Sequence, residues 1–300
     1  MAAPPLCIPG PRKIRATQPP AEAARRPSRS GGDAASCARD RAEERPVPKS
    51  KLARWLLGTL LVLGALVLAL TITLSLPPFG GRIEGERLAR VEAHPQYRNG
   101  AFVNVEPQTP NALGELFTFL GESFFHDQVR VPPAPPPVLE VRPEALALSP
   151  RPDLRAFWIG HASVYVEIDG LRLLIDPVFS DHASPFAVGP KRFHPPPIAL
   201  GALPPIDAVV ISHDHYDHLD MATIQHLAQR GTRFFVPLGS GAHLERWQVP
   251  PAQIAELAWW QEETLKGVRI VSTPTRHYSG RRLDDYKATL WSSWSVIGPE

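Results

Sequence analysis

Residues 213–218 of this 300-residue chain read His-Asp-His-Tyr-Asp-His, and His213, His215, Asp217 and His218 are candidate metal ligands within that run. Neutral imidazoles and a carboxylate are ligands that Zn²⁺ readily accepts. His213 and His215 are two residues apart, so in an extended segment they project to the same side. Asp217 and His218 follow at the turn into a predicted helix, where they can face a second metal ion. The pattern therefore predicts a metal site at the end of a strand.

His277 is a further candidate ligand, because it comes just after a predicted strand. We expect it to supply the third nitrogen to the metal ion held by His213 and His215. Three histidines and one water molecule make a catalytic zinc site with an open position, and the metal lowers the pKa of that water and creates a hydroxide nucleophile. Two metal ions a few ångströms apart can clamp both oxygens of a phosphodiester displacement. Asp217 and His218 are therefore the candidate catalytic residues as well.

The other candidate residues stay open at this point. His161 could lie near the site, but it could equally contact a ligand residue without binding the metal, or pack in the core. Asp176 follows a predicted strand and could orient a ligand histidine through a hydrogen bond, or it could cap a turn. The remaining histidines lack a partner at ligand spacing, and we expect them to be structural or solvated; they are His94, His126, His182, His194, His226 and His243.

The elements that must position these residues are mostly strands, with helices between them. Asp169-Gly170 separates two runs rich in β-branched and aromatic residues and predicts a hairpin turn. The wholly apolar run before the metal motif predicts a buried strand, and Asp220 predicts a helix N-cap just after it. The fold class is therefore α/β or α+β. The predicted strands are 156–168, 171–175, 206–211, 234–238, 268–273 and 288–297, and the predicted helices are 220–231 and 241–247.

Charge and cysteine usage exclude several classes of protein. Residues 1–54 carry 12 Lys or Arg against 5 Asp or Glu, a net charge of +7, whereas residues 82–300 carry 20 against 25, a net of −5. An acidic body argues against nucleic acid as a partner, since phosphate contacts need clustered Lys and Arg. The two cysteines, Cys7 and Cys37, both precede residue 54, so the body has no cysteine nucleophile and no disulfide framework.

The N-terminal quarter predicts a membrane anchor. Residues 1–54 lack an apolar period and are predicted to be a disordered, basic, cytoplasmic tail. Residues 55–76 carry no charge. At about 1.5 Å per residue they span roughly 33 Å, which is enough for a transmembrane helix. Lys and Arg just before this span favour a cytoplasmic tail and an extracytoplasmic body. An uncleaved anchor is favoured over a signal peptide, because no A-x-A-like site follows.

Residues 77–152 are predicted to be a membrane-proximal segment and a Pro-rich linker. Apolar residues recur at helical spacing between 113 and 124. That stripe either packs a helix on the body or faces lipid beside the active site. The body itself is predicted to run over residues 153–300.

Several longer runs are more specific than the metal motif. The motif 213–218 resembles that of the metallo-β-lactamase superfamily. The flanking runs resemble N-acylphosphatidylethanolamine-hydrolysing phospholipases D and together cover most of residues 155–299. They are 158–185, 189–193, 203–219, 235–239, 259–260 and 291–299.

The resemblance implies a fold, a cofactor and a reaction. The fold would be a metallo-β-lactamase αββα sandwich with two zinc ions at one edge. His213, His215 and His277 match the histidines of one zinc, and Asp217 and His218 match ligands of the other. The reaction would cleave a membrane phospholipid to an N-acylethanolamine and a phosphatidic acid. The expected partners are therefore that phospholipid and the lipid bilayer.

The resemblance also sets an expectation about completeness. Such phospholipases continue after the run at 291–299 with a Gly-Asp-Thr turn, whose Asp bridges both metals, and a later His ligand; this sequence ends at Glu300. We therefore expect a C-terminally truncated domain that holds one zinc ion or none and is nearly inactive. Two alternatives are a hydrolase of the same fold acting on a lactone or cyclic phosphoester, since a fold hosts many chemistries, and a membrane remnant without activity.

Overall fold

The computed structural model describes residues 49–106, 131–147 and 154–299. The predicted tail up to residue 48 and the predicted apolar stripe at 113–124 lie outside these described residues. The contacts divide the chain into two compact units, with the boundary between Leu56 and Leu57.

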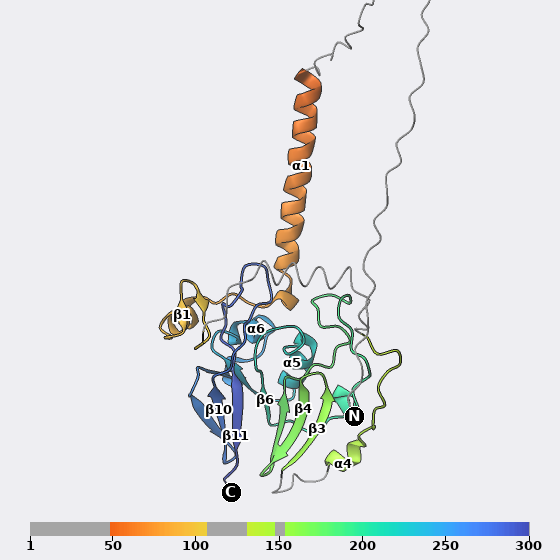
Figure 1. Cartoon of the computed structure of the whole chain (residues 1–300), viewed down its shortest axis with the longest axis vertical. Helices are drawn as coiled ribbons and strands as arrows, with labels where there is room; N and C mark the ends of the chain where they lie inside the picture. Colours follow the sequence, from red (N-terminus) through yellow and green to blue (C-terminus); the bar gives the residue numbers. More distant parts are fainter. Residues whose placement is uncertain (1–48, 107–130, 148–153, 300) are drawn as a thin grey trace, which may run out of the picture. The chain divides into compact units, whose positions relative to one another are not determined.

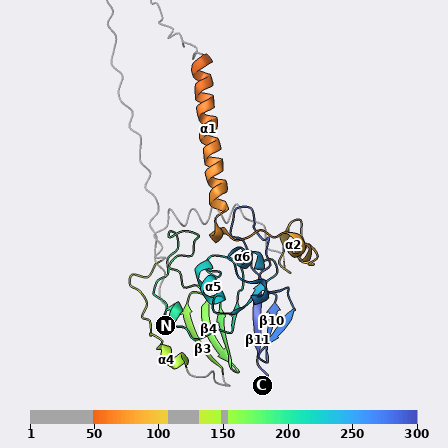
Figure 2. The ribbon, with the colours of Figure 1, turned by 180° about the vertical axis from the view of Figure 1, so that it is seen from behind.

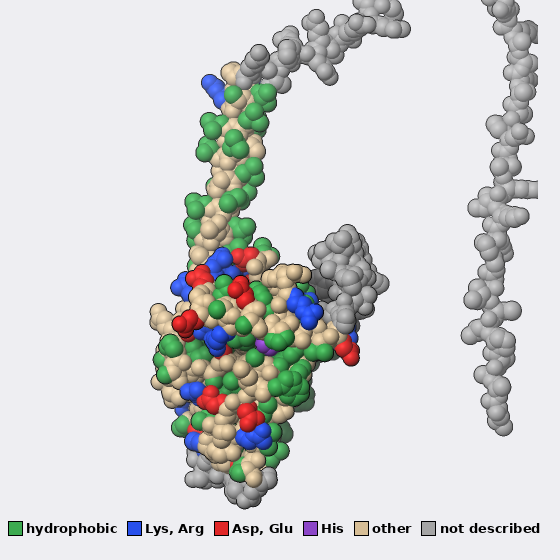
Figure 3. Space-filling model, turned by 90° about the vertical axis from the view of Figure 1, so that its left-hand side faces the viewer, with side chains coloured by type: hydrophobic (Ala, Val, Ile, Leu, Met, Phe, Trp, Pro, Cys, Tyr) green, Lys and Arg blue, Asp and Glu red, His purple; other side chains and the backbone are tan. Residues whose placement is uncertain are grey.

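Helix α1 (Lys49–Leu74) contains the predicted membrane span. Over Ser50–Leu74 the mean hydropathy reaches 2.4, and none of that window is buried by the rest of the protein. It is the one helix in the described part of the chain that is long and apolar enough to cross a membrane. Figure 3 shows hydrophobic side chains along α1, with a basic side chain at its far end. The helix begins six residues before the predicted span and ends two residues before its end.

Two sheets form the body that follows (Figures 1 and 2). A six-stranded sheet has the order β3-β4-β5-β6-β7-β8, and a three-stranded sheet has the order β11-β10-β9. From β3 to β5 the pairing is antiparallel, and from β5 to β8 it is parallel. The bounds are β3 Arg155–Gly160, β4 Ser163–Ile168, β5 Leu171–Ile175, β6 Ala208–Val210, β7 Arg233–Pro237, β8 Ile254–Leu257, β9 Glu262–Leu265, β10 Val268–Thr273 and β11 Ser293–Ile297.

The six-stranded sheet is buried on both faces because its central strands are mainly apolar, and β6 is apolar at every position. Val209 and Phe234 pack in one cluster with Ile224 of helix α5 (Met221–Ala228). Their chain neighbours Val210 and Phe235 pack in a second cluster with the three-stranded sheet. A strand projects successive side chains to opposite faces, so one apolar run serves both layers. The result is the layered mixed α/β fold expected from the sequence.

Helices cover the outer face of the six-stranded sheet. The side chain of Asp220 caps α5 by accepting a hydrogen bond from the backbone N–H of Ala222, so the predicted cap is confirmed. Helix α6 (Gly241–Arg246) follows β7 and contributes Leu244 to the same core. These two helices lie in the half of the body that contains the metal motif.

The segment that follows α1 packs against the body. It forms a one-turn helix η1 (Pro77–Phe79), helix α2 (Gly85–Glu92) and a hairpin of β1 (Tyr97–Arg98) and β2 (Ala101–Phe102). Val91 and Phe102 are fully buried in a third cluster with Trp291. The described part of this membrane-proximal segment therefore shares a core with residues beyond the predicted boundary at 152.

The structure differs from the predicted elements in several places. The single strand predicted at 156–168 is two strands, because His161 has a left-handed φ of 49° and turns the chain between them. Strands β8 and β9 were missed, because each has only four residues and contains acidic ones, namely Glu256 in β8 and Glu262 and Glu263 in β9. The last strand begins at Ser293 rather than 288. The predicted extended linker contains a short helix α4 (Pro143–Ala147).

Candidate metal centre

The metal motif leaves the carboxyl end of β6, in the parallel half of the six-stranded sheet. His213 and His215 come from this loop, and His277 comes from the segment after β10 of the other sheet. His213 Nε2 lies 2.9 Å from His215 Nδ1 and 3.0 Å from His277 Nε2. The structure therefore brings together the three residues that the sequence assigned to one metal ion. We call them the three-histidine group.

Burial keeps the three imidazoles of this group uncharged. It lowers the pKa of His213 to about 2, and repulsion from His218 and His215 adds to the effect. Burial also lowers the pKa of His215 and of His277. At neutral pH each ring therefore offers a lone pair rather than a positive charge.

The donor atoms of the three-histidine group fit a divalent cation. His213 Nε2 meets two other ring nitrogens at once, and a single N–H group cannot satisfy both. All three candidate ligand atoms lie within 4.8 Å of one another. Three neutral imidazole nitrogens around one point are the donor set of a catalytic zinc site with an open position.

A second group adjoins the first and consists of His161, Asp217 and His218. His161 Nε2 lies 2.9 Å from Asp217 Oδ2, and His218 Nε2 lies 3.6 Å from the same oxygen. The rings of His213 and His218 are 4.1 Å apart between centroids, so the two groups are neighbours. Because its two imidazoles share a carboxylate, we call it the mixed group. Sequence reasoning left His161 open, and the structure places it beside the motif through the turn between β3 and β4.

Asp176 contacts His218. Of the two roles that the sequence left open for Asp176, orienting a ligand histidine and capping a turn, this contact favours the first. Asp176 Oδ2 lies 2.8 Å from His218 Nδ1, and the two carboxylate oxygens also accept hydrogen bonds of 2.6 Å from the backbone N–H and the hydroxyl of Ser212. Burial would lower the pKa of His218, but the hydrogen bond and charge of Asp176 outweigh it and raise that pKa. A proton held on Nδ1 leaves the Nε2 lone pair for a metal ion.

Replacing Asp176 with Asn should weaken metal binding at the mixed group about 10- to 100-fold. The amide keeps the shape but loses the charge that fixes the proton on His218 Nδ1, and outer partners of this kind contribute on that scale. Titration of the metal-free protein with Co²⁺ or Zn²⁺ measures the affinity. The matched control is Asp181→Asn, because Asp181 is exposed and belongs to neither group. Equal affinities of Asp176→Asn and the unaltered protein would contradict the assigned role.

Asn104 holds the backbone of His277 and was missed by sequence reasoning. Its Oδ1 accepts a hydrogen bond of 3.0 Å from the His277 N–H, and its Nδ2 donates one of 2.9 Å to the His277 carbonyl. The indole N–H of Trp291 donates to the same Oδ1 at 3.1 Å. These partners are 173 and 187 residues apart from Asn104, so no local pattern could indicate them.

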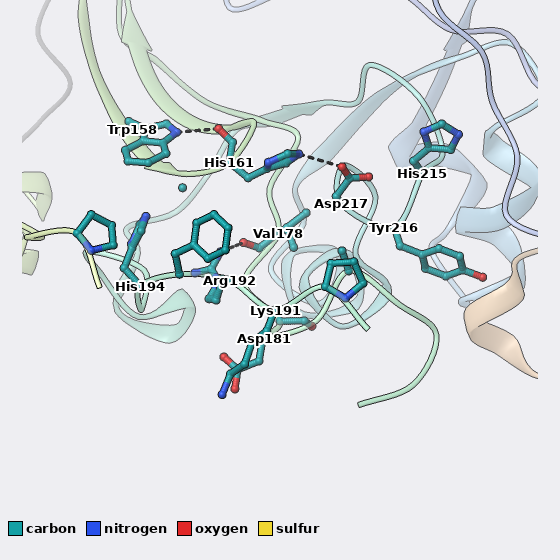
Figure 4. Close-up of a pocket in the computed structure, with 16 residues that line it drawn as sticks. Trp158, His161, Val178, Asp181, Lys191, Arg192, His194, His215, Tyr216 and Asp217 are labelled. Carbon is teal, nitrogen blue, oxygen red and sulfur yellow. Dashed lines mark hydrogen bonds and ion pairs between the residues drawn. The ribbon is translucent and has the colours of Figure 1, made fainter. Parts of the chain in front are cut away.

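A pocket of about 820 Å³ opens beside both groups. One end is lined by His215 of the three-histidine group and by His161 and Asp217 of the mixed group. The indole of Trp158 donates to the His161 carbonyl at 2.7 Å, and Figure 4 shows this bond next to the contact of His161 with Asp217. The remaining wall exposes more apolar than polar surface, and its apolar residues include Pro136, Trp158, Val178, Pro190 and Phe193. It also carries the charged residues Asp181, Lys191 and Arg192.

The fold and the candidate metal centre agree with the comparison to known families. Residues 171–300 match the family model described as the beta-lactamase superfamily domain. This match agrees with the resemblance of the motif at 213–218 to the metallo-β-lactamase superfamily.

Three relatives illustrate what the chain is similar to. It is 45% identical over 215 residues to an uncharacterized protein of Mycobacterium tuberculosis, covering 69% of this chain and 56% of the relative. It is 39% identical over 160 residues to N-acyl-phosphatidylethanolamine-hydrolyzing phospholipase D 1 of Caenorhabditis elegans, covering 48% of this chain and 44% of the relative. It is 31% identical over 126 residues to a metal-dependent hydrolase of Metallosphaera sedula, covering 41% of this chain and 50% of the relative. The chain thus spans about half the length of these relatives.

Proposed function

We propose that the protein is a metal-dependent hydrolase that cleaves the phosphodiester of a membrane phospholipid, namely N-acylphosphatidylethanolamine. The observation that carries the proposal is the pocket, whose one end contains residues of both ligand groups and whose wall is mainly apolar but carries Lys191 and Arg192. Such a pocket suits a substrate with a charged headgroup and an acyl chain. The similarity to the phospholipase of Caenorhabditis elegans supports the same substrate class.

Zn²⁺ is the proposed cofactor, because the two groups offer mainly imidazole nitrogens and one carboxylate. Such donors suit Zn²⁺, and the groups contain neither sulfur nor the many oxygens that Ca²⁺ or Mg²⁺ requires. His213, His215 and His277 would hold one ion, and His161, Asp217 and His218 would contribute to a second position. A bound zinc ion supplies Lewis acidity and lowers the pKa of a water molecule.

The chain's own residues would then position the substrate and move the proton. Trp158 and Phe193 hold the acyl chain against the apolar wall. The water oxygen bonds to phosphorus, and the bond from phosphorus to the N-acylethanolamine oxygen breaks. The Asp217 carboxylate accepts the proton of the water and returns it to the leaving oxygen, while Asp176 fixes His218 beside it.

An activity screen on the full chain in mixed micelles tests the substrate. Because the sequence predicts a nearly inactive domain, we expect only slow release of N-acylethanolamine from N-acylphosphatidylethanolamine with Zn²⁺, detected by mass spectrometry, and none with a chelator. A lactone panel and bis-p-nitrophenyl phosphate serve as comparison substrates. Hydrolysis of lactones alone would replace the proposed substrate, and no hydrolysis by zinc-loaded protein would overturn the enzyme proposal.

Helix α1 is the proposed single-pass anchor, with the tail in the cytoplasm and the hydrolase domain on the opposite side. The support is the length and apolarity of α1, with Lys51 and Arg54 near its N-terminal end. Cys7 and Cys37 are the chain's two cysteines, so a membrane-impermeant maleimide reports on the tail alone. We expect labelling only after the cells are permeabilised; labelling of intact cells would reverse the orientation.

A further inference from the structure

The segment Ser75–Gly81, which follows α1, is fastened to the body by hydrogen bonds along its length. We call this segment the arm. The indole N–H of Trp247 donates to the carbonyl of Pro77 at 2.6 Å, and Arg246 Nη2 donates to that of Ser75 at 3.1 Å. Phe79 is buried and meets the ring of Phe186 edge-on. The arm is therefore a seated part of the hydrolase body.

Two glycines let the arm approach α6 more closely than any other residue could. A Cβ atom on Gly81 would lie 2.1 Å from the carbonyl oxygen of Ala242, which is backbone and cannot move aside cheaply. A Cβ atom on Gly80, whose φ is +80°, would lie 2.1 Å from His243 Nδ1. The backbone of the arm therefore lies directly against the start of α6.

The first connection to the metal motif runs through His243. The N–H of Gly81 donates to His243 Nδ1 at 3.1 Å, which leaves the ring proton on Nε2. His243 Nε2 lies 3.2 Å from Asp214 Oδ2, and both side chains are almost fully buried. Asp214 stands in the chain between two ligands of the three-histidine group. It also accepts a hydrogen bond of 2.7 Å from the Gly280 N–H, in the loop that follows His277.

The second connection runs through the guanidinium of Arg281, which is 5% exposed. Its Nη2 donates to the carbonyl of Pro78 in the arm at 3.0 Å. Its Nη1 donates to the carbonyls of Asp214 and Leu219 at 2.6 and 2.9 Å, near the two ends of the ligand loop. Its planar fork also lies over the ring of Tyr216 at 4.1 Å. One cation thus joins the arm to both ends of the metal motif.

We propose that the arm positions the metal ligands, with His243 and Arg281 as positioning residues that act through the ligand loop. The metal centre then depends on the seating of the chain that leaves the membrane helix. This inference rests on the proposed metal site. It goes further than the proposed site, because it makes the metal affinity depend on the contacts of Pro78 and Gly81. Neither of these two arm residues is a metal ligand.

The test compares Gly81→Ala with Gly201→Ala in the full chain in detergent. A Cβ atom on Gly201 would meet open space, and the φ of Gly201 is not left-handed, so it is a matched control for the same substitution. We expect Gly81→Ala to weaken Co²⁺ or Zn²⁺ binding at least about tenfold, the scale of lost outer-shell support. Hydrogen exchange should quicken in peptides covering residues 213–219 and 276–285. The control should change neither measurement.

Arg281→Lys is the second variant, for use if Gly81→Ala does not fold. A lysine ammonium keeps the charge but lacks the planar fork that reaches the arm and both ends of the ligand loop. Unchanged metal affinity and exchange in a folded variant would overturn the role of the arm and leave the proposed enzyme standing. Absence of metal binding in the unaltered protein would instead defeat the proposed metal site itself.

Discussion

The variant His213→Ala should lose metal at the three-histidine group and should lower kcat/KM for phosphodiester hydrolysis more than about 100-fold, since losing an outer partner of a ligand already costs 10- to 100-fold. His213 is the central ligand of that group, because its Nε2 contacts both other rings. It is also 3% exposed, so the space left by the ring is closed to a replacement ligand from outside. Metal analysis after gel filtration and initial rates with bis-p-nitrophenyl phosphate measure the two effects.

The control for this variant is His226→Ala. His226 lies on α5, outside both ligand groups, and alanine suits a helix. It should keep the metal content and the rate of the unaltered protein. Retention of one tightly held metal ion by His213→Ala would show that the three-histidine group is not the main site. The same measurement on the unaltered chain tests the sequence-based expectation of one zinc ion or none.

Replacing Glu167 with Ala should cost the fold about 3 kcal/mol. The carboxylate is fully buried and accepts hydrogen bonds from Tyr165, from Arg155 and, at 3.4 Å, from Arg172. Removing one partner of a buried ion pair costs about 3–5 kcal/mol, and the lower end applies because the Arg155 side chain is 34% exposed. In a domain of this size the loss corresponds to roughly 6–12 °C in Tm.

Thermal unfolding followed by tryptophan fluorescence measures this loss. Glu262→Ala is the control, because Glu262 also lies on a strand and pairs with an arginine, Arg269, but both side chains are about half exposed. Water screens an exposed ion pair, so the Tm of this variant should hardly move. Equal shifts for the two variants would remove the distinction between the buried and the exposed pair.

The contribution of Glu167 should also depend on pH. Burial would raise the pKa of this carboxyl, but hydrogen bonds from Tyr165 and Arg155 outweigh burial and lower the pKa below its ordinary value of 4.5. Near that pH the unfolded chain binds more protons than the folded one, so the stabilisation is complete above 4.5 and is lost as pH falls through the lower folded value. The Tm difference between the unaltered protein and Glu167→Gln should therefore shrink below pH 4.5.

The sequence predicted those parts of the fold that short patterns encode. The cap at Asp220, the hairpin turn at Asp169-Gly170 and strand β10 each depend on a few neighbouring residues. The split between β3 and β4 was missed, because a left-handed residue at His161 leaves no mark in a run of strand-forming residues. Strand β9 was missed because its polar positions resemble a loop.

The same distinction applies to the candidate metal centre. The ligands at 213–218 are adjacent in sequence and could be assigned from their types and spacing. His161 could be placed only once the pairing of β3 with β4 was known. Asn104 supports His277 over a separation of 173 residues, and Arg281 joins Asp214 to Pro78 over separations of 67 and 203 residues. At such separations tertiary contacts alone decide the partners.

The separation of the ligands along the chain has a consequence for biosynthesis. His213 and His277 are 64 residues apart, so at about 5–20 residues per second His277 leaves the ribosome roughly 3 to 13 s after His213. During that interval Asp176, Ser212 and His218 are already available to one another, whereas the three-histidine group lacks a member. A nascent chain would therefore complete the support of one ligand group before the other can exist.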